Sequence, residues 1–224
     1  MPVTPSKARR SGTDGRKGAG PGRPKDLGKR AAILDAAKAM FTQQGFDGTS
    51  MDQIAAAAGV SKLTVYSHFG DKEALFGEAV RLVCDSLMPD DLFVADPSAP
   101  LRSQLAGIAR AFFAMITSEE ALATHRMMMS PGGDERLRHL FWQAGPERVQ
   151  RAFATFLEAR AAELEIPDLV RAARQFFALL KGDLHTRMAC GLCGNPGAAE
   201  VDENIAATVA MFLRAYGRRP LPAP

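Results

Sequence analysis

Residues 49–72 read TSMDQIAAAAGVSKLTVYSHFGDK, and this stretch decides the fold. Two short segments with helical spacing flank Gly59, the residue type that a tight turn between helices requires. We expect Thr49 to cap the first helix, with Asp52 three residues later as its capping-box partner, and Ser61 to cap the second. The pattern is typical of a helix-turn-helix, whose second helix enters the major groove of DNA.

The second of these helices, residues 62–69, has two distinct sides. At about 100° per residue, Val65 and Phe69 fall on one side and should pack inward. Leu63 and Ser67 fall on the opposite side and should face outward, with Tyr66 on one edge of that outer face. Such a polar outer face suits a short helix that lies against DNA.

Helical spacing extends in both directions from this segment. A helix is expected over residues 29–44 and another from Asp71, as its N-cap, to about residue 87. Residues 88–100 form a connecting loop, and further helices are expected over 101–117, 119–130, 134–144, 146–165, 168–189 and 200–216. Because no segment alternates convincingly with period two, the sequence predicts an all-α protein.

The charge is unevenly distributed along the chain. Residues 1–30 carry nine Lys and Arg against two acids, and the rest carries 19 against 23. Residues 1–27 are rich in Gly, Pro and Ser and predict a disordered basic arm. Within it, Gly22-Arg23-Pro24 resembles hooks that insert an arginine into the DNA minor groove. The alternative is a solvated tail of no consequence.

Several classes of protein are disfavoured. No apolar run approaches the roughly 20 residues that span a bilayer, and the basic N-terminus lacks the apolar core of a secretion signal, so we expect a cytoplasmic protein with no membrane partner. Cys190 and Cys193 with His185 offer only three metal ligands, and a glycine-rich helix end is the simpler interpretation. We expect no metal, no cofactor and no catalytic residues; no nucleotide loop or nucleophile motif is evident.

Many positions at matching spacing give the N-terminal third a specific resemblance. It resembles the TetR/AcrR family of bacterial transcription regulators over roughly residues 28–80. The matching residues are Ile33-Leu34-Asp35-Ala36-Ala37, Phe41, Gly45-Phe46, Thr49-Ser50, Ile54-Ala55, Ala58-Gly59-Val60-Ser61-Lys62, Val65-Tyr66, His68-Phe69 and Asp71-Lys72-Glu73-Ala74-Leu75-Phe76. Residues from Asp183-Leu184-His185 to Phe212–Gly217 look like the AefR-like C-terminal domain of that family.

The resemblance implies a division of the chain and a partner. Residues 28–75 would form the helix-turn-helix domain, residues 76–217 a helical effector-binding and dimerisation domain, and residues 218–224 a tail. The family acts as homodimers on double-stranded DNA operators, dimerises through its last two long helices and usually holds a small-molecule pocket. By position, the DNA contacts would be Thr49, Ser50, Lys62, Leu63, Thr64, Tyr66, Ser67, His68 and Lys72, with Arg23 from the arm.

Residue chemistry separates these contacts by role. The N-terminus of the helix that begins at Thr49 and Ser50 would bind a phosphate, and Lys72, near the N-terminus of another helix, would bind a second. These contacts would set the register on DNA. Tyr66 and His68 can each donate one hydrogen bond to a phosphate, and the alternative is ordinary packing near the first helix. Leu63, Thr64 and Ser67 are the candidates for base edges. Leu63 stands where the family commonly has glycine or proline; it could contact a thymine methyl group or simply be exposed.

Methionine and aromatic residues are frequent between residues 101 and 190 and suit an adaptable apolar pocket. We hypothesise that a largely apolar effector, such as a hydrophobic cation or a fatty molecule, lies between the helices near 101–145 and 168–188, with His125 and Arg126 as possible polar anchors. A plain helical core is the alternative for each residue. The pocket candidates are Phe112, Phe113, Met115, His125, Met128, Met129, Trp142, Phe176 and Phe177.

The last two helices each carry an apolar face, which could form a four-helix bundle with a second copy or close the core of the single chain. The residues are Leu169, Ala172, Ala173, Phe176, Leu180, Ile205, Val209, Phe212 and Leu213. The leading hypothesis is therefore a ligand-responsive repressor that binds a palindromic operator as a homodimer. An activator of the same fold, or a helical ligand-binding protein without DNA binding, is the alternative.

Overall fold

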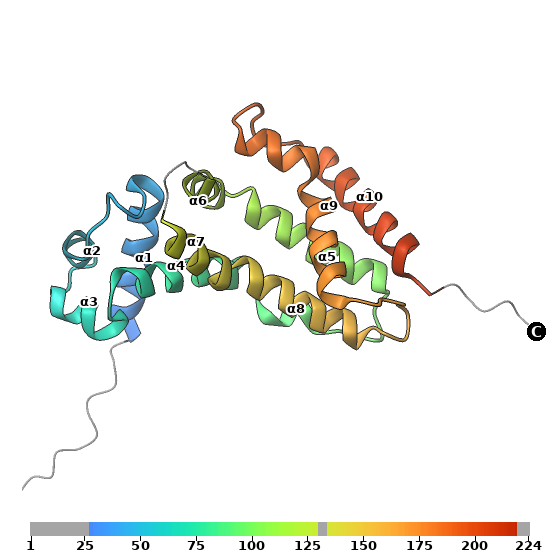
Figure 1. Cartoon of the computed structure of the whole chain (residues 1–224), viewed down its shortest axis with the longest axis horizontal. Helices are drawn as coiled ribbons and strands as arrows, with labels where there is room; N and C mark the ends of the chain where they lie inside the picture. Colours follow the sequence, from blue (N-terminus) through green and yellow to red (C-terminus); the bar gives the residue numbers. More distant parts are fainter. Residues whose placement is uncertain (1–26, 130–133, 219–224) are drawn as a thin grey trace, which may run out of the picture.

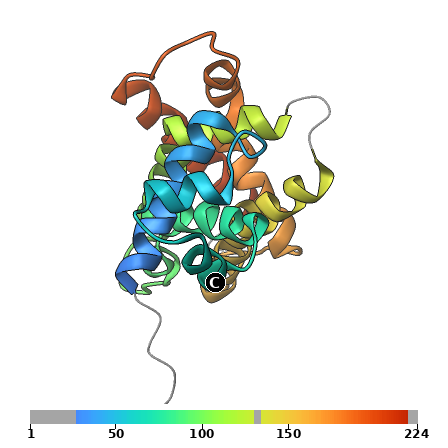
Figure 2. The same cartoon turned by 90° about the vertical axis from the view of Figure 1, so that its left-hand side faces the viewer.

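Helices make up the two halves of the molecule in this computed structural model, which describes residues 27–129 and 134–218 (Figure 1). The N-terminal half holds α1 (Leu27–Gln44), α2 (Met51–Ala57), α3 (Lys62–Phe69) and the start of α4 (Lys72–Leu87). Figure 2 looks onto this end, with α1, α2 and α3 towards the viewer. The described residues contain no strand beyond one isolated bridge between Leu164 and Gly217, so the all-α prediction is confirmed.

Longer helices build the other half. A short 3-10 turn (Asp90–Phe93) precedes them, and their order is α5 (Leu101–Ile116), α6 (Glu119–Met129), α7 (Glu135–Ala144), α8 (Pro146–Ala159), α9 (Leu169–Ala189) and α10 (Ala198–Tyr216). None of the helices described is long and apolar enough to cross a membrane. The arm, with Arg23, lies outside the described residues.

The predicted start of the second helix was wrong by one residue. Ser50, not Thr49, is the N-cap of α2, and its capping-box partner is Gln53 rather than Asp52. The reason is that Thr49 is only 2% exposed and its hydroxyl donates to the carbonyl of Gly45 at 2.8 Å. The Thr49 side chain therefore satisfies the end of α1 and is not free to cap α2.

The predicted end of α8 was also wrong, because the helix stops at Ala159 and not at residue 165. Arg160, 3% exposed, directs its guanidinium to the side chain of Gln104 at 2.8 Å and the carbonyl of Ala99 at 3.1 Å. These bonds tie the end of α8 to α5 and to the loop before it, and the chain then turns to bring Leu164 beside Gly217.

Two hydrophobic cores divide the molecule, and α4 contributes to both. The N-terminal core surrounds the rings of Phe41, Phe46 and Phe76, whose centroids lie 5.3 to 5.8 Å apart. Leu75 and Phe76 of α4 belong to this core, whereas Cys84 of the same helix belongs to the C-terminal core. Fully burying one such phenylalanine stabilises the fold by about 1.5–3 kcal/mol.

The apolar faces of α9 and α10 close the core of the single chain. Of the residues considered for these faces, the ones buried within the protomer are Ala172, Ala173, Phe176, Leu180, Ile205, Val209 and Phe212. The structure therefore selects, for these side chains, the alternative of a protomer core. A different set of residues on the two helices remains exposed, among them Ala178, Leu179, Ala206, Ala207 and Met211.

Candidate functional site

The outer face of α3 is an exposed surface held by a buried inner face. Ser61 caps the helix by accepting a hydrogen bond from the backbone N–H of Thr64, and Gly59 (φ 65°) makes the turn before it. Val65 and Phe69 are buried in the N-terminal core, as predicted from their spacing. Leu63 is 78% exposed on the opposite side, so the predicted orientation of the helix is confirmed.

The remaining candidates on this surface form a polar neighbourhood around Leu63. The ammonium of Lys62 pairs with the carboxylate of Asp52 at 2.8 Å and lies 5.9 Å from the centre of the Tyr66 ring. Hydrogen bonding and attraction to Asp52 raise the pKa of Lys62. The Ser67 hydroxyl donates to the carbonyl of Thr64 at 2.8 Å and, like Tyr66, is exposed. Ser50, the N-cap of α2, is exposed as well.

Two predicted contacts have other structural tasks. Lys72 donates to the carbonyls of Phe46 at 2.9 Å and Thr49 at 3.0 Å, and its ammonium lies 4.1 Å from the centre of the Phe46 ring. It therefore holds the turn between α1 and α2, while the Thr49 hydroxyl bonds the end of α1. His68 is half-buried, and its Nδ1 is buried with no hydrogen-bond partner among the described residues.

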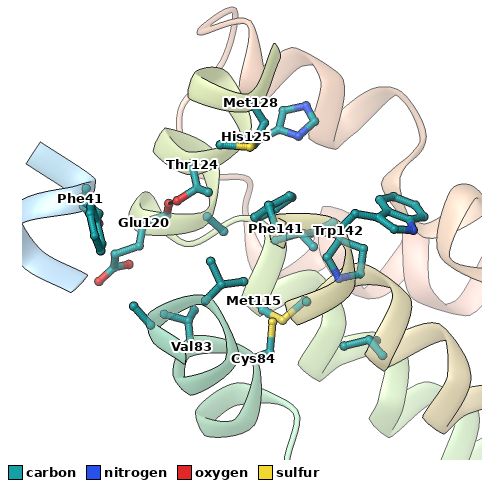
Figure 3. Close-up of a pocket in the computed structure, with 18 of the residues that line it drawn as sticks. Phe41, Val83, Cys84, Met115, Glu120, Thr124, His125, Met128, Phe141 and Trp142 are labelled. Carbon is teal, nitrogen blue, oxygen red and sulfur yellow. Dashed lines mark hydrogen bonds between the residues drawn. The ribbon is translucent and has the colours of Figure 1, made fainter. Parts of the chain in front are cut away.

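A cavity of about 340 Å³ lies where the two halves of the molecule meet (Figure 3). Phe41 enters it from α1, Val83 and Cys84 from α4, and Phe141 and Trp142 from α7. The predicted pocket residues that line this cavity are Phe112, Met115, His125, Met128, Met129 and Trp142. The volume lies in the range of small-molecule sites.

Three predicted pocket residues do not line the cavity. Phe113, Phe176 and Phe177 are buried in the C-terminal core, where the ring centroids of Phe176 and Phe177 lie 5.7 Å apart. Adjacent residues on a helix point about 100° apart, so Phe112 faces the cavity while Phe113 faces the core. Arg126, named as an anchor beside His125, is exposed outside the cavity for the same reason.

Sequence reasoning missed the lining from α1 and α4 and two lining residues of α9. Lys38, Phe41 and Thr42 of α1, with Phe76, Val80, Val83 and Cys84 of α4, line the cavity. Lys181 and His185 of α9 complete one end of it. No local pattern marks these residues, because their approach depends on how α1 packs against α6, α4 against α5 and α7, and α6 against α9.

The cavity wall holds several titratable groups. Glu120 pairs with Lys38 at 3.4 Å, and hydrogen bonding to its own backbone at the start of α6, with a further contribution from Lys38, lowers the pKa of its carboxyl group. Burial raises the pKa of the Cys84 thiol to about 11. Burial also lowers the pKa of His125 and brings the pKa of His185 down to about 4, with nearby Lys181 adding to both effects.

Two family descriptions match this chain over the two halves that the structure separates. Residues 33–79 match "Bacterial regulatory proteins, tetR family", and residues 103–218 match "AefR-like transcriptional repressor, C-terminal domain". The chain belongs to the TetR family. It is a transcriptional regulator with a DNA-binding helix-turn-helix domain. The members of this family are DNA-binding regulators and not enzymes.

Solved TetR-family structures match nearly the whole chain. The Flavonoid-responsive Regulator FrrA is 38% identical, with a TM-score of 0.71, and the match covers 87% of this chain and 100% of FrrA. A TetR-family regulator from Mesorhizobium loti MAFF303099 is 29% identical, with a TM-score of 0.72, and the match covers 88% and 100%.

Curated relatives match over shorter stretches. The regulator AcrR of Shigella flexneri is 41% identical over 81 residues, which are 34% of this chain and 38% of AcrR. YhgD of Bacillus subtilis (strain 168) is 33% identical over 101 residues, 45% of this chain and 50% of YhgD. The chain thus spans half or less of the length of these two relatives.

Proposed function

We propose that this regulator is a ligand-responsive repressor that binds a palindromic operator as a homodimer and leaves it when a small, largely apolar molecule fills the cavity. One observation carries the proposal: the cavity is lined both by α1 of the DNA-binding half and by α5, α6, α7 and α9 of the other half. A ligand there contacts Phe41 of the N-terminal core directly. A change at the ligand can therefore reach the DNA-binding surface through packed side chains.

The DNA contact divides into positioning and reading residues. Ser50 and Lys62, exposed at the starts of α2 and α3, are placed to bind phosphates and set the register. Leu63, Thr64 and Ser67 on the outer face are placed to meet base edges, and Leu63 offers apolar contact to a thymine methyl group. We assign Lys72 and Thr49 to holding the turn before α2, because their polar atoms already have partners there.

The release of DNA on ligand binding would follow because the cavity and the N-terminal core share residues. A ligand shifts the protein only towards conformations to which it binds better. Because Phe41 and Phe76 belong to both the cavity wall and the N-terminal core, a ligand that displaces either ring also displaces α1 or α4. The helix α3 is held by α4 directly and by α1 through α2. The distance between the two α3 helices of a dimer would therefore change, and both could no longer fit one duplex.

The exposed faces of α9 and α10 are the proposed dimer interface. Small and apolar residues lie there, with Ala178 and Leu179 on α9 and Ala206, Ala207 and Met211 on α10. Small residues allow two helix pairs to approach closely across a two-fold axis. Two-fold symmetry in turn requires a palindromic operator with half-sites about one helical turn apart, or a multiple of it.

Relatives support the repressor assignment and the kind of effector. The matching C-terminal family is described as a repressor, and NalD of Pseudomonas aeruginosa, 26% identical with a TM-score of 0.58, is named the secondary repressor of the MexAB-OprM efflux pump. FrrA is named for its response to flavonoids, which are flat aromatic molecules. The NalD name supports the repressor assignment, and the FrrA name supports an aromatic effector for the cavity of this chain.

Selection of DNA from a random pool, followed by gel retardation, tests the DNA half of the proposal. We expect a symmetric consensus that binds two chains per site, and a flavone added at micromolar concentration to reduce binding. The proposal is overturned if no fragment is retarded.

Sedimentation at micromolar concentration tests the dimer. Leu179→Glu should give a monomer, while Val94→Glu, also at an exposed apolar residue but far from α9 and α10 in the sequence, should leave the dimer intact. A wild-type chain that sediments as a monomer would end the homodimer proposal.

A further inference from the structure

One end of the cavity carries a cluster of nitrogen-bearing side chains. Lys181 and His185 come from α9 and His125 from α6, which packs against α9; Figure 3 shows His125 among the lining residues. The ring centroids of His125 and His185 lie 5.3 Å apart, edge to face. His185 is only 6% exposed, and none of the described residues forms a hydrogen bond with its ring nitrogens. An imidazole on a cavity wall whose ring nitrogens have no partner in the protein can exchange hydrogen bonds with a polar ligand atom.

The charges on the wall are unbalanced. Among the described lining residues, Lys38, Lys181 and Arg138 are cations and Glu120 is the one acid. Glu120 pairs with Lys38 at 3.4 Å, and Arg138 donates to the carbonyl of Met128 at 3.2 Å. Lys181 has no hydrogen-bond or ion-pair partner among the described residues. With Lys38 and Glu120 paired, Lys181 is the cation whose charge the described residues leave uncompensated, and it lies close enough to both imidazoles to lower their pKa values.

A bend in α9 at Gly182 lies between Lys181 and His185. Gly182 has φ 46° and ψ −149°, a conformation that only glycine adopts readily. Backbone carbonyls at the bend have side-chain partners: Asn204 of α10 donates to Leu180 at 2.8 Å, and Thr186 donates to Gly182 at 3.0 Å. The bend is thus supported by α10, which fixes the part of the cavity wall that carries the cluster.

The chemistry of this cluster favours an anionic oxygen. Removing a lysine ammonium from water without a counter-ion costs free energy, and burial accordingly lowers the pKa of Lys181. A bound anion would pair with that ammonium, while the imidazole N–H groups donate to the same group. A cationic ligand would instead meet Lys181 directly, and like charges in a poorly solvated site repel strongly.

We propose that the effector of this cavity is a flat apolar molecule with one acidic group, a carboxylate or a phenol that ionises beside Lys181, whose anionic oxygen binds among Lys181, His125 and His185. The apolar part lies against Phe112, Phe141 and Trp142. This inference rests on the proposed ligand response, of which it names the ligand class.

Four probes of matched size test the inference by isothermal titration calorimetry: 2-naphthoate, 2-naphthol, 2-naphthamide and 2-naphthylmethylamine. We expect 2-naphthoate or 2-naphthol to bind at least tenfold tighter than the amide, and the amine to bind weakest. Which of the two acids binds more tightly identifies the acidic group. Equal affinity for all four, tightest binding of the amine, or no binding at millimolar concentration overturns the inference.

Matched variants locate the acidic group. Lys181→Met should weaken binding of the preferred acid at least tenfold and that of the amide less than threefold, while Lys181→Arg should keep most of the affinity. Arg187→Met is the control, because Arg187 lies on the same helix but outside the cavity lining. An equal loss in the Arg187 variant would show a diffuse charge effect and overturn the assignment.

The wild-type chain supplies an independent readout should Lys181→Met not fold. An anion beside His125 and His185 raises their pKa values, so the protein should take up protons when it binds 2-naphthoate at pH 6. Calorimetric titration in two buffers of different ionisation enthalpy measures this proton uptake. The amide should take up fewer, and equal uptake counts against the inference.

Gel retardation with the same probes separates this inference from the proposed function. If the amide or the amine releases DNA as well as 2-naphthoate does, the ligand response stands and the acid-binding inference falls. If 2-naphthoate binds tightly through Lys181 yet leaves the DNA complex intact, the acid-binding inference stands and the proposed response to this cavity falls.

Discussion

The sulfur of Met127 accepts a hydrogen bond from the backbone N–H of Phe46, with a nitrogen–sulfur distance of 3.4 Å. This bond joins α6 to the turn between α1 and α2, which in turn holds the start of the helix-turn-helix. Met127 also packs against the N-terminal core. It is thus a direct link between the helix that carries His125 and the half that binds DNA.

Met127→Ala should loosen this link. The change leaves the N–H of buried Phe46 without its partner and removes packing, which together cost about 1–3 kcal/mol. We expect faster amide hydrogen exchange in a peptide covering residues 41–50, with Met127→Leu, which keeps the packing but not the sulfur, showing an intermediate rate. Unchanged exchange in Met127→Ala would show that α6 does not support this turn.

Lys62→Ala should weaken binding to every DNA sequence and lower the slope of log affinity against log salt by about one. The paired variant Asp52→Asn should act in the opposite direction, because it removes the carboxylate that holds Lys62 at 2.8 Å. Both are measured by titrating operator and unrelated DNA at several salt concentrations. A salt slope that stays the same in Lys62→Ala would remove this lysine from the phosphate contacts.

The stability of the fold should fall as the pH drops from about 6.5 to about 4. Burial lowers the pKa of His185 to about 4 in the folded chain, against 6.5 for an unperturbed histidine, so the unfolded chain binds more protons in this range. By that shift alone, the free energy of unfolding should be about 2 kcal/mol lower at pH 5 than at pH 7. His125 adds to the effect in the same direction.

Urea unfolding of wild type and His185→Phe at both pH values isolates this contribution. The variant keeps a ring in the cavity wall but has no proton to bind, so its loss of stability between pH 7 and pH 5 should be clearly smaller. Equal losses in the two proteins would contradict the buried, neutral state of His185.

Thiol reactivity should differ sharply along the chain. Cys84 is buried on the cavity wall and its pKa is raised to about 11, which leaves about a hundredfold less thiolate than at an unshifted pKa of 9.0. Cys190 is exposed. A disulfide reagent at pH 8 should modify Cys190 quickly and Cys84 at least a hundredfold more slowly, with Cys84→Ser as the control. Rapid loss of the Cys84 thiol would indicate an open cavity.

Local sequence patterns were enough to predict α3 and its orientation. The spacing of Val65 and Phe69 placed them inside, and Leu63 is exposed as expected, because a short helix with two apolar residues on one side has one way to bury them. The predicted N-cap of α2 was wrong by one residue because Thr49 and Ser50 are both residue types that favour the N-cap position. Only the neighbouring carbonyl of Gly45 decides which hydroxyl is free.

The cavity was predicted in part. Phe112 and Met115 lie on the cavity side of α5, as expected, but Phe113, Phe176 and Phe177 pack in the core. Methionine and aromatic residues suit a pocket and a core equally well, so composition could not separate them. The bend at Gly182 was also missed, because a single glycine in a helical pattern does not reveal its backbone angles.

The sequence by itself determined the all-α fold, the helix-turn-helix and the face of α3 that points outward, since each depends on residues within a few turns of one another. The tertiary structure alone decided which residues enclose the cavity. Lys38 and Phe41 lie more than 80 residues from His125 and Lys181 in the chain, yet all four line one space. The packing of α1 against α6, and of α6 against α9, brings them together, and no local spacing encodes such an approach.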